Sequence, residues 1–528
     1  MLACTLLALA LRLYTLTRSG YLTGVTEYDD GVYLGGAVRL LHGALPYRDF
    51  AFVQPPGILL LTLPVALLTK ITTTTHALAA ARILTVLAST ACVPLAGRLV
   101  RHRGTLVTLV TCGILAVYPA DIATAHTLIL EPWMNLLALT GAVLAFRRGV
   151  LAGPWRLLGA GAAIGAATSV KFWAGLPAVV LLAVCLLSAA PDGGRWRRTG
   201  RYVLGLAAGF GLPVLPFALA APTVFVRSTL LDQAARFGTY VPHSMRLANV
   251  TGLIDFLNAH GHFTIFAGAH SVYAGGPATP GTGAGLLSYL VVLAGVVLVA
   301  AGYWLRSGPP SPLEAFALAT AVLATAAITF YSAFFYHYPD FGAPWIAISA
   351  GGAFGALSGG RFATWLAARY PGGGAVRIRQ ALTRTIAVLL VLLAAFQAHE
   401  TFSQAAPDIY HDQADIPAGA CVVTDEISLL ISANRFTPVR SGCPDVLDSL
   451  GETLVRSNGV SVQGGAANIP EVVAAWKSIL DRADYVWLSP ANGVHIPWTP
   501  QLTGWFHANF TELPARDSVG RVFKRTGA

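Results

Sequence analysis

The chain has 528 residues, of which 55% are hydrophobic and only 11% are charged, whereas an ordinary soluble domain carries about 25% charged residues. This composition excludes an ordinary soluble protein and indicates that most of the chain lies in lipid. The formal charge of +10 does not indicate nucleic acid as a partner, because the Arg residues form short clusters between apolar runs rather than one basic face.

Apolar runs recur along the chain at the length of membrane spans. A transmembrane helix needs about 20 apolar residues to cross a bilayer core of about 30 Å. The first run lacks the flanking charge and small-residue cleavage site of a removable signal peptide. We therefore expect an α-helical polytopic membrane protein with about eleven spans, near residues 1–17, 78–97, 104–119, 132–146, 156–170, 172–190, 202–221, 284–305, 313–335, 341–358 and 384–400.

The Arg clusters predict the orientation, because short loops rich in Lys and Arg face the cytoplasm. Four clusters would share that side if the N-terminus is cytoplasmic: Arg98, Arg101 and Arg103; Arg147, Arg148 and Arg156; Arg195, Arg197, Arg198 and Arg201; and Arg361, Arg369, Arg377, Arg379 and Arg384. Residues 1–401 then form a transmembrane module of the plasma membrane. Its loops 18–77 and 222–283 lie outside the cell, as does the tail, 402–528.

The tail changes character and predicts a small extracytoplasmic α/β domain. "GACVVTDEISLLI" and "ADYVWLS" are β-branched and aromatic runs, while "EVVAAWKSILDRA" has apolar residues at helical spacing. Cys421 and Cys443 both lie in the tail, where an oxidising compartment would permit a disulfide. Two buried thiols are the alternative.

The first loop carries the acidic stretch "EYDDGVY", residues 27 to 33. A helical rhythm of apolar residues follows and stops at "HGALPY", which places Asp29 and Asp30 at the N-terminal end of a short amphipathic helix on the membrane surface. The next segment, "PPGILLLTLPVALLTKI", is interrupted by Pro64 and suits a surface or re-entrant helix better than a span.

These features together resemble a known family. The acidic pair with an aromatic residue three positions on, the "GALPYRDF" turn, "QPPG" and the "AARIL" span are similar to the first external loop of GT-C glycosyltransferases. The resemblance is closest to bacterial relatives of protein O-mannosyltransferases and to the aminoarabinose transferase that modifies lipid A. It implies transfer of a sugar from a polyprenyl-phosphate donor, with inversion, on the outer face of the membrane.

The resemblance also implies roles for particular residues. Asp29 matches the family's catalytic base and Asp30 the second acid of its pair. Lys171 and the "FFYHYPDFGAPW" stretch, with His337 and Tyr338, resemble family segments that face the first loop. Arg48, Lys171 and His337 are the external cations expected to bind the departing phosphate, together with Tyr338. The family often has a basic residue before its "PP", where this chain has Gln54.

Glu131 lies where the second external loop meets a span, and an ionisable group at that depth indicates either function or a structural ion pair. Together with Asp29 and Asp30 it could hold a divalent cation, Mg²⁺ or Mn²⁺, through oxygen ligands. No sequence pattern requires that metal. His260, His262 and His270 are spaced without metal-site regularity, and we expect them to be solvated or in contact with substrate.

Two other classes of function compete with a glycosyltransferase. A transporter or lipid flippase would also use many spans, but paired repeats and matched interrupted helices are not evident. A scaffold that binds envelope polymer would tolerate loss of Asp29. The Ala-, Arg- and Gly-rich composition suggests an actinobacterial envelope, with mannose or arabinofuranose as the sugar and a glycan, lipid or protein as the acceptor.

Overall fold

A computed structural model describes residues 1–188, 194–235, 241–252, 282–305, 309–357, 361–370, 373–402, 405–406, 415–439, 442–444, 446–489, 493–514 and 519–527. A helix occupies each predicted span: α1 (Leu2–Leu16), α4 (Thr74–Val100), α5 (Thr105–Val117), α7 (Leu130–Ala145), α8 (Pro154–Val170), α9 (Gly175–Leu187), α10 (Arg195–Ala220), α16 (Thr282–Leu305), α17 (Pro312–Phe330), α18 (Tyr338–Phe354) and α20 (Gly374–Phe402). The predicted polytopic helical fold is therefore confirmed.

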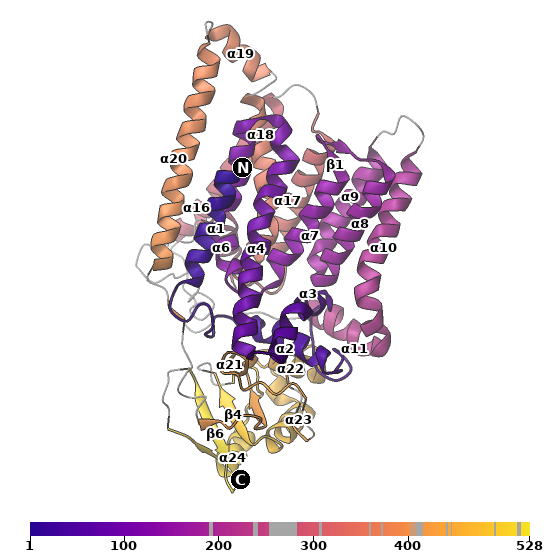
Figure 1. Cartoon of the computed structure of the whole chain (residues 1–528), viewed down its shortest axis with the longest axis vertical. Helices are drawn as coiled ribbons and strands as arrows, with labels where there is room; N and C mark the ends of the chain where they lie inside the picture. Colours follow the sequence, from indigo (N-terminus) through magenta and orange to yellow (C-terminus); the bar gives the residue numbers. More distant parts are fainter. Residues whose placement is uncertain are drawn as a thin grey trace.

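The helices differ in how well each could cross a bilayer alone. Within the described ranges, four are long and apolar enough: Thr74–Arg103, Arg195–Ala220, Pro312–Phe330 and Gly374–Phe402. A fifth candidate is the pair α5 and α6 (Pro119–Ala125), bent by 51°. Pro119 begins α6, where its fixed φ and missing N–H are tolerated. The remaining shorter helices pack among these in one bundle (Figure 1).

Two short helices close one end of the bundle. Helix α2 (Tyr28–Leu41) is capped by Glu27, and α3 (Gly57–Ala66) contains Pro64 and continues as a 3₁₀ turn over Leu67–Lys70. The expected amphipathic character of α2, with one buried face, is wrong, because every residue from Asp30 to Arg39 is buried. Helix α2 packs against α3, α4 and a helix of the tail, so it has no open polar face.

The tail forms the predicted α/β domain below this end of the bundle (Figure 1). Its sheet has the order β3 (Val422–Thr424), β4 (Tyr485–Leu488), β6 (Arg521–Arg525) and β5 (Phe510–Glu512), with β3 parallel to β4 and the other pairs antiparallel. Its helices are α21 (Ile427–Ser432), α22 (Ser449–Ser457), α23 (Pro470–Asp481) and α24 (Pro500–Asn509). Its core combines aliphatic side chains with buried aromatic ones, which include Trp476, Phe506 and Phe523.

One part of the tail differs from the sequence-based expectation. The run "ISLLI" is β-branched and apolar, yet Ile427–Ser432 forms helix α21. This helix is buried between α2 and the start of α4, so apolar residues are favoured on both of its sides. Burial therefore outweighs the strand propensity of these residues. Cys421 and Cys443 form the disulfide that closes the segment containing α21.

Candidate active site

The acidic stretch lies at the first turn of α2, where the N-terminal helix dipole favours negative charge. Glu27 caps the helix by accepting a hydrogen bond from its neighbour's backbone N–H, at 3.1 Å. Asp29 is half-buried and accepts a hydrogen bond from the Tyr33 hydroxyl, one turn on, at 2.9 Å. Asp29 is thus held by its own helix and remains partly accessible.

Asp30 has a different environment from Asp29. Its carboxylate is fully buried and pairs with Arg82 of α4 at 2.5 Å. It also accepts hydrogen bonds from the Thr26 hydroxyl, at 3.1 Å, and from the backbone N–H of Leu128. A carboxylate with these partners ties three segments together, so we assign Asp30 a structural place in the site.

A second cluster joins three expected residues from three elements. Glu131 lies in the first turn of α7, Lys171 follows α8, and His337 precedes α18. The Lys171 ammonium bonds Glu131 Oε1, and His337 Nδ1 lies 2.9 Å from the same oxygen. All three side chains are buried. The structure therefore brings these predicted residues together as a carboxylate flanked by two basic groups.

Aromatic rings enclose the ammonium of this cluster. The Lys171 Nζ atom lies 4.4 Å from the centroid of the Tyr338 ring and 5.1 Å from that of Trp173. Ring faces attract a cation, and the attraction is stronger where water is excluded. Tyr338 is thus brought to the cluster as expected, and its ring contacts Lys171.

Two tyrosines connect the acidic stretch to this cluster. The Tyr336 hydroxyl donates to Glu27 Oε2 at 2.8 Å, and the next residue, His337, contacts Glu131. Burial, together with the nearby charges of Asp29 and Glu131, raises the pKa of Tyr33 well above its usual range. Tyr33 therefore stays protonated and can donate its hydrogen bond to Asp29. The two clusters form one site.

Arg48 is not brought to this site. Its side chain is 51% exposed and pairs with the adjacent Asp49 at 2.8 Å. Gln54, which stands where the resembling family often has a basic residue, accepts a hydrogen bond from the Tyr47 hydroxyl through its backbone carbonyl, at 2.5 Å. The basic groups at the described site are thus Lys171, His337 and Arg82.

The three carboxylates considered for a divalent cation do not form a ligand set. Asp30 is paired with Arg82, and Glu131 is paired with Lys171 and His337. Over the part of the chain that the structure describes, no group of three His, Cys, Asp or Glu side chains could hold a metal ion. His260, His262 and His270 lie outside the described residues.

Sequence reasoning missed the roles of Arg82, Tyr336 and Glu27 at the site. Arg82 carried a signal, because a single Arg within an apolar span, here in "AARIL", requires a buried partner. Tyr336 and Glu27 carried none beyond their places in "FFYHY" and before the acidic pair. Their contact joins residues 309 positions apart, which only the packing of the chain could reveal.

Burial affects the titration of two carboxyls at the junction with the tail. It raises the pKa of Glu27 from 4.5 to about 8, and the charges of Asp29, Asp30 and Glu426 add to this effect while the Tyr336 hydrogen bond opposes it. Burial, with the charges of Asp425 and Asp30, raises the pKa of Glu426 to about 8 as well. Both carboxyls therefore hold protons that exposed carboxyls would release.

These shifts predict that stability decreases as the pH rises. Between pH values of about 4.5 and 8, the folded chain retains protons that the unfolded chain has lost, so the free energy of unfolding decreases through this window. Glu426→Gln removes one such group. The melting temperature of the variant should decrease less than that of the parent across this range. Parallel pH profiles for the two proteins would contradict the assignment.

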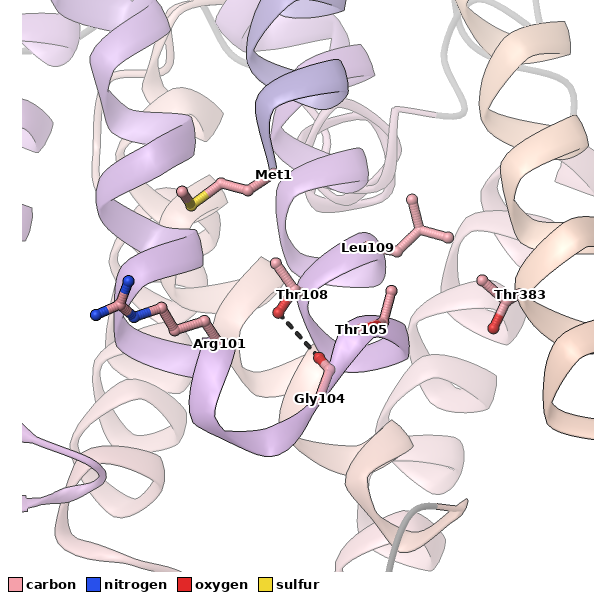
Figure 2. Close-up of a pocket in the computed structure, with 7 residues that line it drawn as sticks. All are labelled: Met1, Arg101, Gly104, Thr105, Thr108, Leu109 and Thr383. Carbon is pink, nitrogen blue, oxygen red and sulfur yellow. Dashed lines mark hydrogen bonds between the residues drawn. The ribbon is translucent and has the colours of Figure 1, made fainter. Parts of the chain in front are cut away.

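Figure 2 shows the lining of a separate cavity, which has a volume of about 460 Å³. Its lining includes Arg101, Gly104 and Thr108, whose hydroxyl donates to the Gly104 carbonyl at 2.9 Å. Arg101, in the cavity lining, and Arg82, in the candidate site, lie on the same helical segment. At about 1.5 Å per residue, about 28 Å along the helix axis separates them. None of the described lining residues is a carboxylate, so this cavity is not part of the candidate active site.

The fold of the chain has counterparts among solved structures. The chain has the GT-C membrane glycosyltransferase fold. It is similar over 100% of its length to ArnT from Cupriavidus metallidurans bound to undecaprenyl phosphate, covering 98% of that chain at 14% identity with a TM-score of 0.51.

Two further solved structures share the fold. One is the oligosaccharyltransferase of Archaeoglobus fulgidus in the apo form, with 12% sequence identity and a TM-score of 0.54. The match covers 100% of this chain and 74% of the oligosaccharyltransferase chain. The other is the arabinofuranosyltransferase AftD from Mycobacteria, with 13% sequence identity and a TM-score of 0.50. The match covers 99% of this chain and 40% of the AftD chain. Neither a protein-family model nor a curated protein matches the sequence.

Proposed function

We propose that the protein is a glycosyltransferase that uses a polyprenyl-phosphate sugar as its donor. The observation that carries the proposal is the half-buried carboxylate of Asp29 beside the buried Lys171, His337 and Glu131 cluster, at one end of a GT-C bundle. The similar ArnT structure is bound to undecaprenyl phosphate, which supports a lipid phosphate as the donor's leaving group.

The proposed reaction is a single displacement with inversion. Asp29 accepts the proton of an acceptor hydroxyl as the hydroxyl oxygen forms a bond to the anomeric carbon of the sugar. The bond from that carbon to the phosphate oxygen breaks, and the lipid phosphate leaves with the electron pair. A phosphate anion needs little protonation to depart, so one carboxylate suffices as the base.

In this proposal the departing charge is stabilised by Lys171 and His337. Both groups already contact Glu131, which is fully buried. Glu131 holds the two basic side chains in place before the donor binds, so they need no rearrangement when negative charge develops on the phosphate. Tyr338 and Trp173 limit the access of water to Lys171.

The sugar and the acceptor are narrower parts of the proposal. We propose mannose or arabinofuranose as the sugar, and an envelope glycan, lipid or protein as the acceptor. The test is incubation of the purified protein with radiolabelled polyprenyl-phosphate mannose and polyprenyl-phosphate arabinose, in separate reactions containing envelope extract. Consumption of one donor is expected. If both donors remain intact while labelled lipid crosses vesicles that contain the protein, the protein is a flippase.

The proposed orientation places the site and the tail outside the plasma membrane, as the Arg clusters predict. A reporter enzyme that is active only outside the cytoplasm should be active when fused after residue 528. The same reporter fused after Gly104, which follows Arg101 and Arg103, should be inactive. The reverse pattern would place Asp29 on the cytoplasmic side and contradict the donor assignment.

A further inference from the structure

The tail holds the first turn of α2 through one buried serine. Ser428 lies in α21, and its hydroxyl accepts a hydrogen bond from the Gly31 N–H at 2.9 Å. The same hydroxyl can donate to the carbonyl of Glu27 at 2.6 Å or of Tyr28 at 3.0 Å. These backbone groups flank Asp29 on both sides, so one side chain of the tail bonds the turn that carries it.

A second contact anchors the same turn to another tail helix. The Tyr28 hydroxyl donates to Asp448 at 2.7 Å and lies 3.2 Å from the Ser449 hydroxyl. Asp448 is the N-cap of α22 and accepts a hydrogen bond from the Gly451 N–H at 2.8 Å. The residue directly before Asp29 is thus fixed to the start of a tail helix.

Close packing makes the Ser428 contact specific for this turn. A β-carbon at Gly31 would lie 2.3 Å from the backbone nitrogen of Ser428, closer than real side chains approach. Gly31 therefore lets the backbones of α2 and α21 meet. A larger residue would separate the hydroxyl from its partners.

Helix α21 is itself fixed to the membrane bundle. The Thr74 hydroxyl, at the start of α4, donates to the Ile431 carbonyl at 2.7 Å, and the Thr75 hydroxyl donates to that of Ser432 at 2.7 Å. Helix α4 also carries Arg82, the partner of Asp30. The turn that carries Asp29 is therefore held by α21 and by α4, and these two helices are hydrogen-bonded to each other.

We propose that Ser428 is a positioning residue for Asp29, so that the tail is part of the active site's construction rather than a separate binding module. The kinetic test of this inference rests on the proposed function, because it measures sugar transfer. A displacement of about 1 Å in a catalytic group can reduce turnover about 100-fold. Loss of the Ser428 hydroxyl would release the turn without removing any group that contacts substrate.

The test compares Ser428→Ala with Ser432→Ala in the full-length protein. Ser432 lies on the same helix and is also buried, but its hydroxyl has no hydrogen-bond partner among the described residues. In Ser428→Ala, kcat should fall about 10- to 100-fold while KM for the lipid donor changes less than about twofold. Ser432→Ala should match the parent. Ser428→Thr, which keeps a hydroxyl, should recover part of the turnover.

Hydrogen–deuterium exchange measures the same effect without any substrate. Amides of residues 28–34 should exchange faster in Ser428→Ala than in Ser432→Ala, while those of strand β4 remain unchanged. If Ser428→Ala does not fold, Tyr28→Phe provides the second variant, because it removes only the hydroxyl bonded to Asp448. Its kcat should fall and the same amides should exchange faster.

Equal kcat and equal exchange in the Ser428 and Ser432 variants would overturn the proposal. The proposal would also be overturned if kcat falls only in proportion to the decrease in melting temperature and the amides of residues 28–34 exchange at the parent's rate. Ser428 would then have only a structural role. If the parent transfers neither sugar but residues 28–34 respond as expected, the proposed function fails while the anchoring of this turn by Ser428 stands.

Discussion

Asp29→Asn is expected to reduce turnover by about two to four orders of magnitude, because the amide has no basic lone pair to accept the proton of the acceptor hydroxyl. The fold should survive. An amide oxygen can still accept the hydrogen bond that Tyr33 donates to Asp29, at 2.9 Å in the parent. The measurement is transfer from the labelled donor by a purified variant whose melting temperature matches that of the parent.

Asp30→Asn provides the matched control one residue away. Asp30 is fully buried with Arg82, so its loss leaves a buried guanidinium without its carboxylate. Breaking such a pair typically costs about 3 to 5 kcal/mol of stability. The Asp30 variant should therefore lose stability more than the Asp29 variant and lose less turnover per folded molecule. A stable Asp29→Asn protein with full activity would remove the base assignment.

The second large effect is expected at Lys171. Lys171→Met keeps the unbranched chain as far as its fourth atom but removes the ammonium bonded to Glu131. Turnover should fall about 30- to 1,000-fold, which corresponds to about 2 to 4 kcal/mol of lost transition-state stabilisation. Stability should also decrease, by about 3 to 5 kcal/mol, because Glu131 then remains buried with only His337 as its basic partner.

A double variant separates these two effects. Glu131→Gln in the Lys171→Met background removes the buried carboxylate that the single variant leaves uncompensated. The free energy of unfolding should recover toward that of the parent, because the effects of substitutions at two residues in contact are not additive. Turnover should not recover, because no ammonium is restored. Recovery of both would show that Lys171 only balances the charge of Glu131.

The sequence alone predicted a polytopic helical membrane protein and much of its chain order. Runs of about 20 apolar residues placed the spans, because the thickness of the bilayer sets their length. The tail was recognisable from its short β-branched runs and the helical spacing of residues 471–483. The resemblance to a known family indicated Asp29, Asp30, Lys171, His337 and Tyr338. Glu131 was indicated by the cost of an ionisable group beside a membrane span.

Only the tertiary structure decided what each of these residues contacts. Asp29 and Asp30 are adjacent in sequence and alike in chemistry, yet Arg82 reaches Asp30 and Tyr33 reaches Asp29. Arg48 and Lys171 are both external cations by sequence, but Arg48 pairs with Asp49 at the surface. Partner choice of this kind depends on side-chain geometry between elements far apart in the chain, and residue type carries no information about it.

The position of α2 illustrates the same physical limit. Its apolar rhythm predicted a surface helix with one buried face, because hydrophobic periodicity reports only the faces that need burial. The tail covers the remaining face through Ser428, which accepts from the Gly31 N–H, and Asp448, which accepts from the Tyr28 hydroxyl. These hydrogen bonds satisfy polar groups and leave no apolar signal in the sequence. The sequence thus determined that a helix begins at the acidic pair, and the packing of the tail decided that this helix is enclosed.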